Sequence, residues 1–154
     1  MPRFEPDPSK ISATIAILEK DEYEFLVGEP KSFEKKNADG TIANYGIRYP
    51  LTVMEGPRKG AKQFQTCYQH TEGSEAFSKR FVMACLGYDG TPDGEKAFDS
   101  AYAGRDWSFN TDDGSCGEVW RECANKRVFG AADVGVNNKT KEPMQQFTGW
   151  RALQ

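Results

Sequence analysis

The sequence has no apolar run long enough to cross a lipid bilayer. A transmembrane helix needs about 20 consecutive apolar residues, and no segment of this 154-residue chain approaches that length. The first eight residues, MPRFEPDP, also lack the apolar core of a secretory signal. We therefore expect a protein that does not enter a membrane and that resides in the cytosol.

Residue types that carry out catalysis are scarce as well. The only histidine is His70, and the sequence contains neither Gly-x-Ser-x-Gly nor a glycine-rich phosphate loop with its lysine. Histidine is often exposed or half-buried, so a surface turn accounts for His70 without a catalytic role. Because no nucleophile, base and acid occur at a usable spacing, we expect no enzymatic activity and no cofactor.

The four cysteines are too few and too irregularly spaced for a disulfide scaffold, and a cytosol keeps them reduced. A zinc site is the alternative. Cys67 and His70 have the spacing C-x-x-H, and Cys116 and Cys123 could complete a tetrahedral set. The spacing of the second pair does not match a zinc knuckle, and Cys67 also fits a strand pattern. Free thiols remain the favoured interpretation.

The composition that is present indicates one folded domain. The chain is 38% hydrophobic and 28% charged and has 15 glycines, which is typical of a globular protein with many turns. At this length it can bury a core without disulfides or metals. We assign residues 1–12, which are rich in proline, to an N-terminal arm and residues 13–154 to the domain.

Apolar alternation predicts three consecutive strands in the first half of the domain. Residues 22–27, 43–55 and 61–69 each alternate with a period of two. Asp39-Gly40 predicts a tight turn before the second strand, and Gly56-Pro57 marks the tip between the second and the third. These strands therefore form a meander.

The period then changes to that of an amphipathic helix. Ser74 is a candidate N-cap, and apolar residues recur at intervals of three and four up to Gly87 or Gly90. Residues 89–99 form an acidic loop, in which residues 95–103 are a candidate for a short helix. A strand is expected over 104–110, and 128–136 and 145–152 predict a final pair. This order predicts a mainly β protein, a five-stranded OB-fold barrel with one amphipathic helix between strands three and four.

Charge is unevenly distributed along the chain. The net charge is −3, which argues against a protein covered in cations. Residues 31–80, however, contain nine Lys or Arg against five Asp or Glu, whereas residues 81–118 contain two against eight. A segregation of this kind predicts one basic surface on an acidic protein.

Residues 119–154 are basic as well, with six Lys or Arg against three Asp or Glu, and both basic segments contain aromatic residues. Cations that track phosphates, together with rings that stack on bases, hold single-stranded nucleic acid without sequence preference. The candidate contacts are Lys31, Phe33, Lys35, Lys36, Arg48, Arg58, Lys59, Lys62, Phe64, Tyr68, Lys126, Arg127, Lys139 and Lys141.

Which of these rings face outward is left partly open by the sequence. On the second strand, Tyr45, Ile47, Tyr49 and Leu51 share one face, which we assign to the core, so Arg48 points the other way. On the third strand, either Phe64, Thr66 and Tyr68 or the intervening glutamines face outward. The tryptophans Trp120 and Trp150 are assigned to the core.

The stretch EYEFLVGEPKSFEKKNADGTIANYGIRYPLTVMEGPRKGAKQF, the helix SEAFSKRFVMACLGY and the late segment GRDWSFN resemble the small OB-fold single-stranded DNA-binding proteins of bacteriophage replication and recombination modules. The resemblance implies sequence-independent binding of single-stranded DNA, phage replication or recombination proteins as partners, and the cytoplasm of a bacterial host as location. The C-terminal residues GWRALQ depart from the acidic tail of many such proteins, which puts tail-mediated recruitment in doubt.

A second interpretation assigns the same barrel to protein binding. In that case the acidic segment 81–118 is the functional surface, and nucleic acid is not bound.

Overall fold

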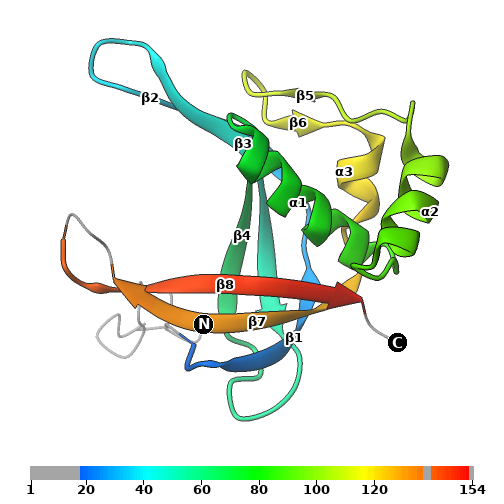
Figure 1. Ribbon diagram of the computed structural model, residues 1–154. Helices are drawn as coiled ribbons and strands as arrows, with labels where there is room; N and C mark the ends of the chain where they lie inside the picture. Colours follow the sequence, from blue (N-terminus) through cyan, green and yellow to red (C-terminus); the bar gives the residue numbers. More distant parts are fainter. Residues whose placement is uncertain (1–17, 137–139, 153–154) are drawn as a thin grey trace, which may run out of the picture.

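A computed structural model describes residues 18–136 and 140–152. The predicted arm over residues 1–12 and the candidate contact Lys139 lie outside this described part. Within it, the chain forms a six-stranded antiparallel sheet, a two-stranded hairpin and three helices (Figure 1). The mainly β prediction is confirmed. No helix in the described ranges is both long and apolar enough to span a membrane.

The large sheet is built from most of the strands that alternation predicted. Its order is β2-β3-β1-β7-β8, and β4 pairs with β3. The strands are β1 (Asp21–Val27), β2 (Lys31–Lys36), β3 (Ile42–Val53), β4 (Lys62–Tyr68), β7 (Arg127–Val136) and β8 (Pro143–Ala152).

The long strand β3 organises the sheet because it pairs along both of its edges. One edge pairs with β4, from Gly46 opposite Tyr68 to Thr52 opposite Lys62. The other edge pairs first with β2 and then with β1. Between β1 and β2 the chain bends at Gly28, whose N–H donates to the Pro50 carbonyl at 2.8 Å. A Cβ at Gly28 would lie 2.7 Å from Cγ of Pro50, so only glycine fits this close approach.

The structure contains more elements than the five strands and one helix expected from sequence. The helices are α1 (Glu72–Cys85), α2 (Pro92–Tyr102) and α3 (Glu118–Glu122), and β5 (Phe109–Asn110) and β6 (Ser115–Cys116) form a short hairpin. Helix α1 begins earlier than predicted because Thr71 is its N-cap and forms a reciprocal capping box with Ser74.

The strand predicted over residues 104–110 is wrong except at its last two residues. The side chain of Asp106 accepts hydrogen bonds from the backbone N–H of Ser108 at 3.0 Å and from its hydroxyl at 2.6 Å. Such local bonds compete with a strand ladder and favour a turn. Apolar alternation at Trp107 and Phe109 therefore reflects two rings that pack on the core, one from a loop and one from the first residue of the short strand β5.

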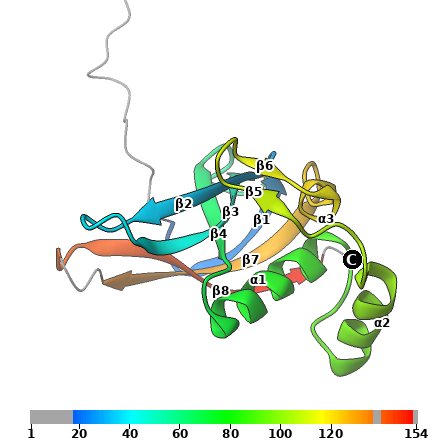
Figure 2. The ribbon, with the colours of Figure 1, turned by 90° about the horizontal axis from the view of Figure 1, so that it is seen from above.

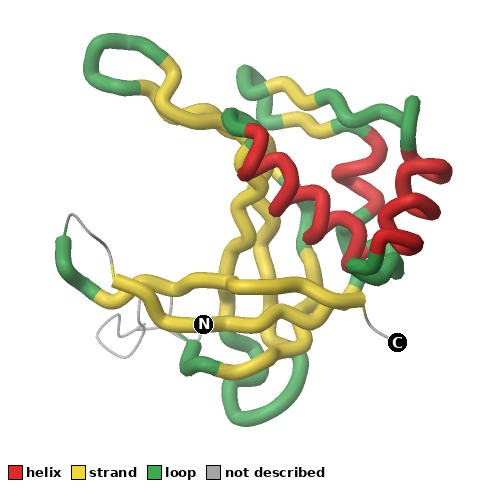
Figure 3. Tube along the Cα trace, in the orientation of Figure 1, coloured by secondary structure: helices red, strands yellow, loops and turns green. Residues whose placement is uncertain are grey.

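The sheet is not closed into a barrel. In the described part of the chain, β4 pairs only with β3 and β8 only with β7. Helix α1 packs against both β4 and β8. Figures 1 and 3 show the three helices gathered on one side of the molecule, away from the β2–β3 and β7–β8 hairpin ends.

The core lies between the inner face of the sheet and α1. The row predicted to be buried on β3 is confirmed for Ile47, Tyr49 and Leu51, which are fully buried. Tyr45, the fourth member of that row, is only half-buried, because it lies beyond α1 with its ring beside Phe109 and His70. The Tyr49 hydroxyl donates to the Trp120 carbonyl at 2.6 Å, and burial raises its pKa well above the ordinary value. Trp120 is buried, and Trp150 packs on the core, as expected.

Candidate nucleic-acid interface

The outward surface of three neighbouring strands carries half of the predicted contact residues, seven of the fourteen. Because side chains alternate along a strand, residues on β3 that flank the buried row point away from the core. We name this surface the β2–β3–β4 face. It consists of Lys31, Phe33, Lys35, Arg48, Lys62, Phe64, Thr66 and Tyr68.

The structure decides which residues of β4 face outward. Gln63 and Gln65 are only 3% and 4% exposed, whereas Phe64 and Tyr68 are 42% and 37% exposed. Large rings left this open to solvent are uncommon in a core-forming role. Both rings are therefore available to a ligand.

Arg48 lies between two of the rings. Its guanidinium carbon is 5.4 Å from the centroid of Phe33 and 5.6 Å from that of Phe64. In the register, Arg48 stands opposite Lys31 on β2 and opposite Thr66 on β4. Ring faces attract a cation at this range, so the guanidinium is held within an aromatic surface.

Gly46 lets the rings of β2 and β4 meet across β3. It stands opposite Phe33 on one side and Tyr68 on the other, and the two ring centroids are 5.9 Å apart in an edge-to-face arrangement. A Cβ at Gly46 would overlap the backbone carbonyl of Cys67. The missing side chain thus makes Phe33 and Tyr68 one continuous aromatic patch.

The cations of this face have no acidic partner among residues 18–136 and 140–152. No ion pair in these ranges involves Lys31, Lys35, Arg48 or Lys62, and Lys62 instead donates to the Thr52 hydroxyl at 2.8 Å. Lys36, at the end of β2, lies 3.6 Å from a Glu34 carboxylate oxygen. The β2–β3–β4 face therefore keeps most of its positive charge.

The basic turn between β3 and β4, which contains Arg58 and Lys59, lies apart from the ends of the β2–β3 and β7–β8 hairpins. Figure 1 shows the β3–β4 turn at the bottom of the molecule, at the opposite end of β3 from the β2–β3 turn. Arg58 forms an ion pair with Glu19 at 3.2 Å, and Lys59 is exposed. Arg58 and Lys59 lie close to Lys62 in sequence, but the charge of Arg58 is shared with the Glu19 carboxylate.

The remaining predicted cations are distributed between two other places. Lys126 and Arg127 lie at the start of β7, and Arg127 is 3.8 Å from a Glu24 carboxylate oxygen. Ten extended residues put the start of β7 about 30 Å from its far end. Lys141 lies near that far end, in the β7–β8 connection. Figures 1 and 2 agree that the β2–β3 and β7–β8 hairpins project on the same side of the molecule.

His70 is the residue that sequence reasoning left out of the site. Its ring lies 5.5 Å from that of Tyr68 and 6.3 Å from that of Tyr45, and the residue is exposed. The expectation of a surface turn is confirmed. The sequence could have indicated that His70 borders the aromatic surface, because it follows Tyr68 by two residues, just past the end of β4.

The zinc alternative has no support in the geometry. Cys67 and Cys123 are fully buried, and burial raises the pKa of the Cys67 thiol far above its usual value. His70, in contrast, is on the surface with the aromatic rings. No group of three or more possible metal ligands occurs within the described ranges.

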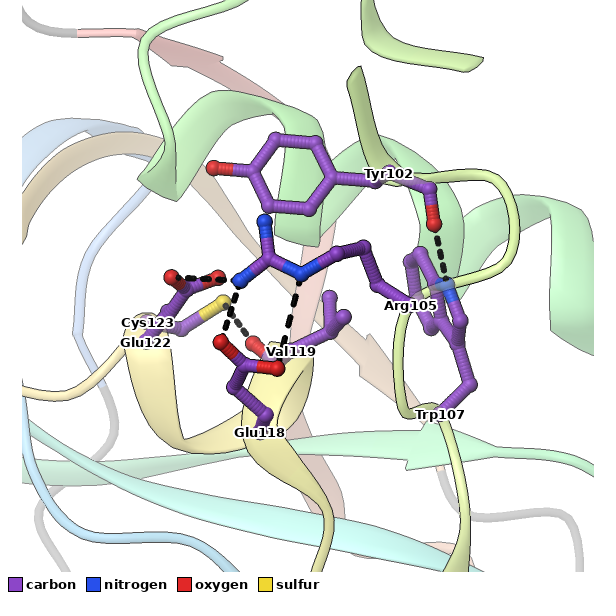
Figure 4. Close-up of polar contacts among 7 residues, drawn as sticks. All are labelled: Tyr102, Arg105, Trp107, Glu118, Val119, Glu122 and Cys123. Atoms are coloured by element: carbon purple, nitrogen blue, oxygen red, sulfur yellow. Dashed lines mark hydrogen bonds and ion pairs between the residues drawn. The ribbon is translucent and has the colours of Figure 1, made fainter. Parts of the chain in front are cut away.

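The acidic segment 81–118 is partly neutralised by its own contacts. Lys79 lies 3.0 Å from Glu95 and 2.9 Å from Asp99, and its pKa is raised by the hydrogen bond to Asp99. Figure 4 shows Arg105 between Glu118 and Glu122, with the Glu122 oxygen at 3.1 Å. These carboxylates are used within the fold.

A scan against protein-family models and a search of curated proteins both find no match to this chain.

Proposed function

We propose that the protein binds single-stranded DNA without sequence preference through the β2–β3–β4 face. The observation that carries the proposal is the placement of Arg48 between Phe33 and Phe64 on a face whose cations lack carboxylate partners among the described residues. A cation set into exposed rings offers both interactions that a single strand requires: charge for the phosphates and flat surfaces for the bases.

We further propose that the fold is a divergent, open OB barrel. The two segments β1 and β2 pair along the same edge of β3, which supports reading them as one strand bent at Gly28. With that reading, five strands remain and α1 lies between the third and the fourth. The antiparallel pairing of β1 with β7 is also the pairing that this topology requires.

In the proposed complex, each part of the face has a separate task. Lys31, Lys35 and Lys62 neutralise phosphates, and Phe64 and Tyr68 stack on bases. Stacking contributes about 1–3 kcal/mol per base and tolerates any sequence. No bond is made or broken, so the protein acts as a binder that protects single strands in a phage replication or recombination system of a bacterial host.

The test is a titration of dye-labelled oligothymidine against a duplex of equal length, followed by fluorescence anisotropy at two salt concentrations. An external dye is needed because none of the three tryptophans belongs to the proposed face. We expect preference for the single strand and an affinity that falls with log salt by about 0.7 per phosphate contact. Equal affinity for both forms, or no binding at low salt, would overturn the proposal.

Protein binding by the acidic segment is the second candidate, and the structure favours it less. Three of its acidic residues, Glu95, Asp99 and Glu118, are held by Lys79 or Arg105. A partner would have to displace these contacts.

A further inference from the structure

One titratable side chain borders the β2–β3–β4 face without belonging to it. His70 follows β4, and its exposed ring lies 5.5 Å from that of Tyr68 in an edge-to-face arrangement. The Tyr68 ring in turn lies 5.9 Å from that of Phe33. The three rings are therefore in contact one after another, from β2 to the turn that precedes α1.

His70 is also of the residue type that changes charge near neutral pH. Histidine is ordinarily cationic at about pH 5 and neutral at about pH 8, and His70 is the only histidine of the chain. Shifts of other groups in the described ranges lead away from this interval. For example, the hydrogen bond from Arg151 lowers the pKa of Glu22, and burial raises the pKa of Cys67. A pH change across this interval therefore acts on the aromatic surface through one position.

The carboxylates near His70 leave its ring unpaired. The titratable groups on the elements around it are Glu34 on β2, Tyr45 on β3, Tyr68 on β4, and Glu72 and Glu75 in the first turn of α1. Among residues 18–136 and 140–152, none of these carboxylates forms an ion pair with His70, and Glu34 lies 3.6 Å from Lys36 instead. A positive charge on His70 is therefore open to an external anion, as the charge of Arg48 is.

A cation at this position has a use in the proposed complex. Tyr68 is 37% exposed and is one of the two rings assigned to base stacking. Every stacked base brings a phosphate with it, since sugar and phosphate are bonded to the same nucleotide. On β4 the only cation is Lys62, at the other end of the strand and about 20 Å from Tyr68 along the extended chain. His70 is the basic side chain that directly contacts the Tyr68 ring.

From this placement we infer that His70 is a pH-dependent phosphate contact of the β2–β3–β4 face. The protonated imidazole donates a hydrogen bond to the phosphate of the nucleotide whose base stacks on Tyr68, and the neutral imidazole adds no charge. Affinity for single-stranded DNA therefore rises as the pH falls from about 8 to about 6. This role rests on the proposed function, because it adds regulation to that same face.

The test is an anisotropy titration of dye-labelled oligothymidine with the full chain at about pH 6 and about pH 8, at equal ionic strength. We expect an affinity about fivefold higher at the lower pH, the effect of one exposed ion pair. The slope of log affinity against log salt should also be steeper by about 0.7 at the lower pH, because one more phosphate is contacted.

Three variants at exposed positions separate a phosphate contact from a general effect of charge. His70→Gln should bind as the parent protein does at the higher pH and should lose both pH effects. His70→Lys carries a permanent cation and should bind with the higher affinity at both pH values. The matched control combines His70→Gln with Ala97→His, which moves the histidine to α2, a helix that contributes no residue to the face. It should not restore the pH dependence.

A second measurement follows the imidazole itself. Because the chain has one histidine, its imidazole proton resonance in an NMR spectrum is assigned without ambiguity. Saturating oligothymidine should move the midpoint of the pH titration of this resonance to higher pH, since a ligand that prefers the protonated form stabilises it.

Equal affinity of the parent protein at both pH values would overturn the role of His70 and leave DNA binding by the face intact. The same holds for a pH dependence that persists in His70→Gln, for one that Ala97→His restores, and for a resonance midpoint that oligothymidine does not move. Absence of binding at both pH values would overturn the proposed function as well.

Discussion

Two outward surfaces of the same sheet carry similar residues but differ in how their arginines are paired. On the β2–β3–β4 face, Arg48 lies over Phe33 and Phe64. On the surface formed by Glu22, Glu24, Arg127, Phe129 and Arg151, which we name the β1–β7–β8 face, Arg151 lies 4.1 Å from the Phe129 centroid.

The difference lies in the carboxylates. Arg151 also donates from Nε to Glu22 at 2.9 Å, and Arg127 lies beside Glu24. Arg48 has no such partner among the described residues. A ring with a cation over it therefore does not by itself indicate a nucleic-acid site, because phosphates approach only where the positive charge is not already neutralised. The following experiments test this contrast, from the largest expected effect to the smallest.

Removal of the two exposed rings should have the largest effect. Phe64→Ala with Tyr68→Ala should weaken binding to oligothymidine by at least about 30-fold, since each lost stack costs about 1–3 kcal/mol. Anisotropy titration measures the change. Phe129→Ala on the other face is the matched control and should change affinity by less than about twofold. Equal losses in both proteins would remove the distinction between the faces.

Thr66→Glu should give the β2–β3–β4 face the neutralised arginine that is found on the β1–β7–β8 face. Thr66 stands opposite Arg48 in the register, so a carboxylate there would pair with Arg48 as Glu22 does with Arg151. We expect a loss of affinity of about tenfold or more, from one neutralised cation and one added repulsion. Thr66→Gln has nearly the same shape without the charge and should bind almost as the parent protein does. If both variants bind alike, the absence of carboxylates is not what defines the site.

The salt dependence should separate cations that contact phosphates from those that do not. Lys31→Ala with Lys62→Ala should reduce the slope of log affinity against log salt by about 1.4, because two phosphate contacts are lost. Lys126→Ala with Arg127→Ala removes the same charge at the start of β7 and should leave the slope unchanged. Identical slopes in the two double variants would mean that only net charge matters.

Glu22→Gln should have the smallest effect on binding and a pH-dependent effect on stability. The hydrogen bond from Arg151 lowers the pKa of Glu22 below its ordinary value. A carboxyl whose pKa is lower in the folded state adds stability above its unfolded pKa and loses it as pH falls through the folded value. Thermal unfolding should show Glu22→Gln slightly below the parent protein at neutral pH and equal to it in acid. A difference that persists in acid would show that the charge of Glu22 is not its cause.

Much of the sheet could be predicted because the alternation of apolar and polar residues along a β-strand directly indicates which side chains are buried. The core row of β3 and both late strands follow from that period. The sequence indicated α2 only as a short helix over 95–103 and did not indicate α3, because their short amphipathic patterns lie in a turn-rich segment whose packing depends on Phe98 and Trp120.

The candidate site could be predicted only in its composition. The sequence gathers the cations and rings in residues 31–80, but it does not give the registers that place Arg48 opposite Lys31 and Thr66. Nor does it show that Glu19, Glu22 and Glu24 neutralise Arg58, Arg151 and Arg127. Ion pairing between distant strands depends on tertiary contacts. The sequence alone therefore does not distinguish Arg48, which has no carboxylate partner among the described residues, from Arg151, which has one.

The buried thiols of Cys67, Cys85 and Cys123 have a kinetic consequence. A thiol enclosed in this way meets a reagent only during the moments when the surrounding helix and strands separate. The rate at which a buried thiol is alkylated therefore reports how often the native protein opens locally, under conditions in which almost all molecules are folded. Cys116 is partly exposed, so its alkylation rate gives the intrinsic reactivity of the reagent in the same sample.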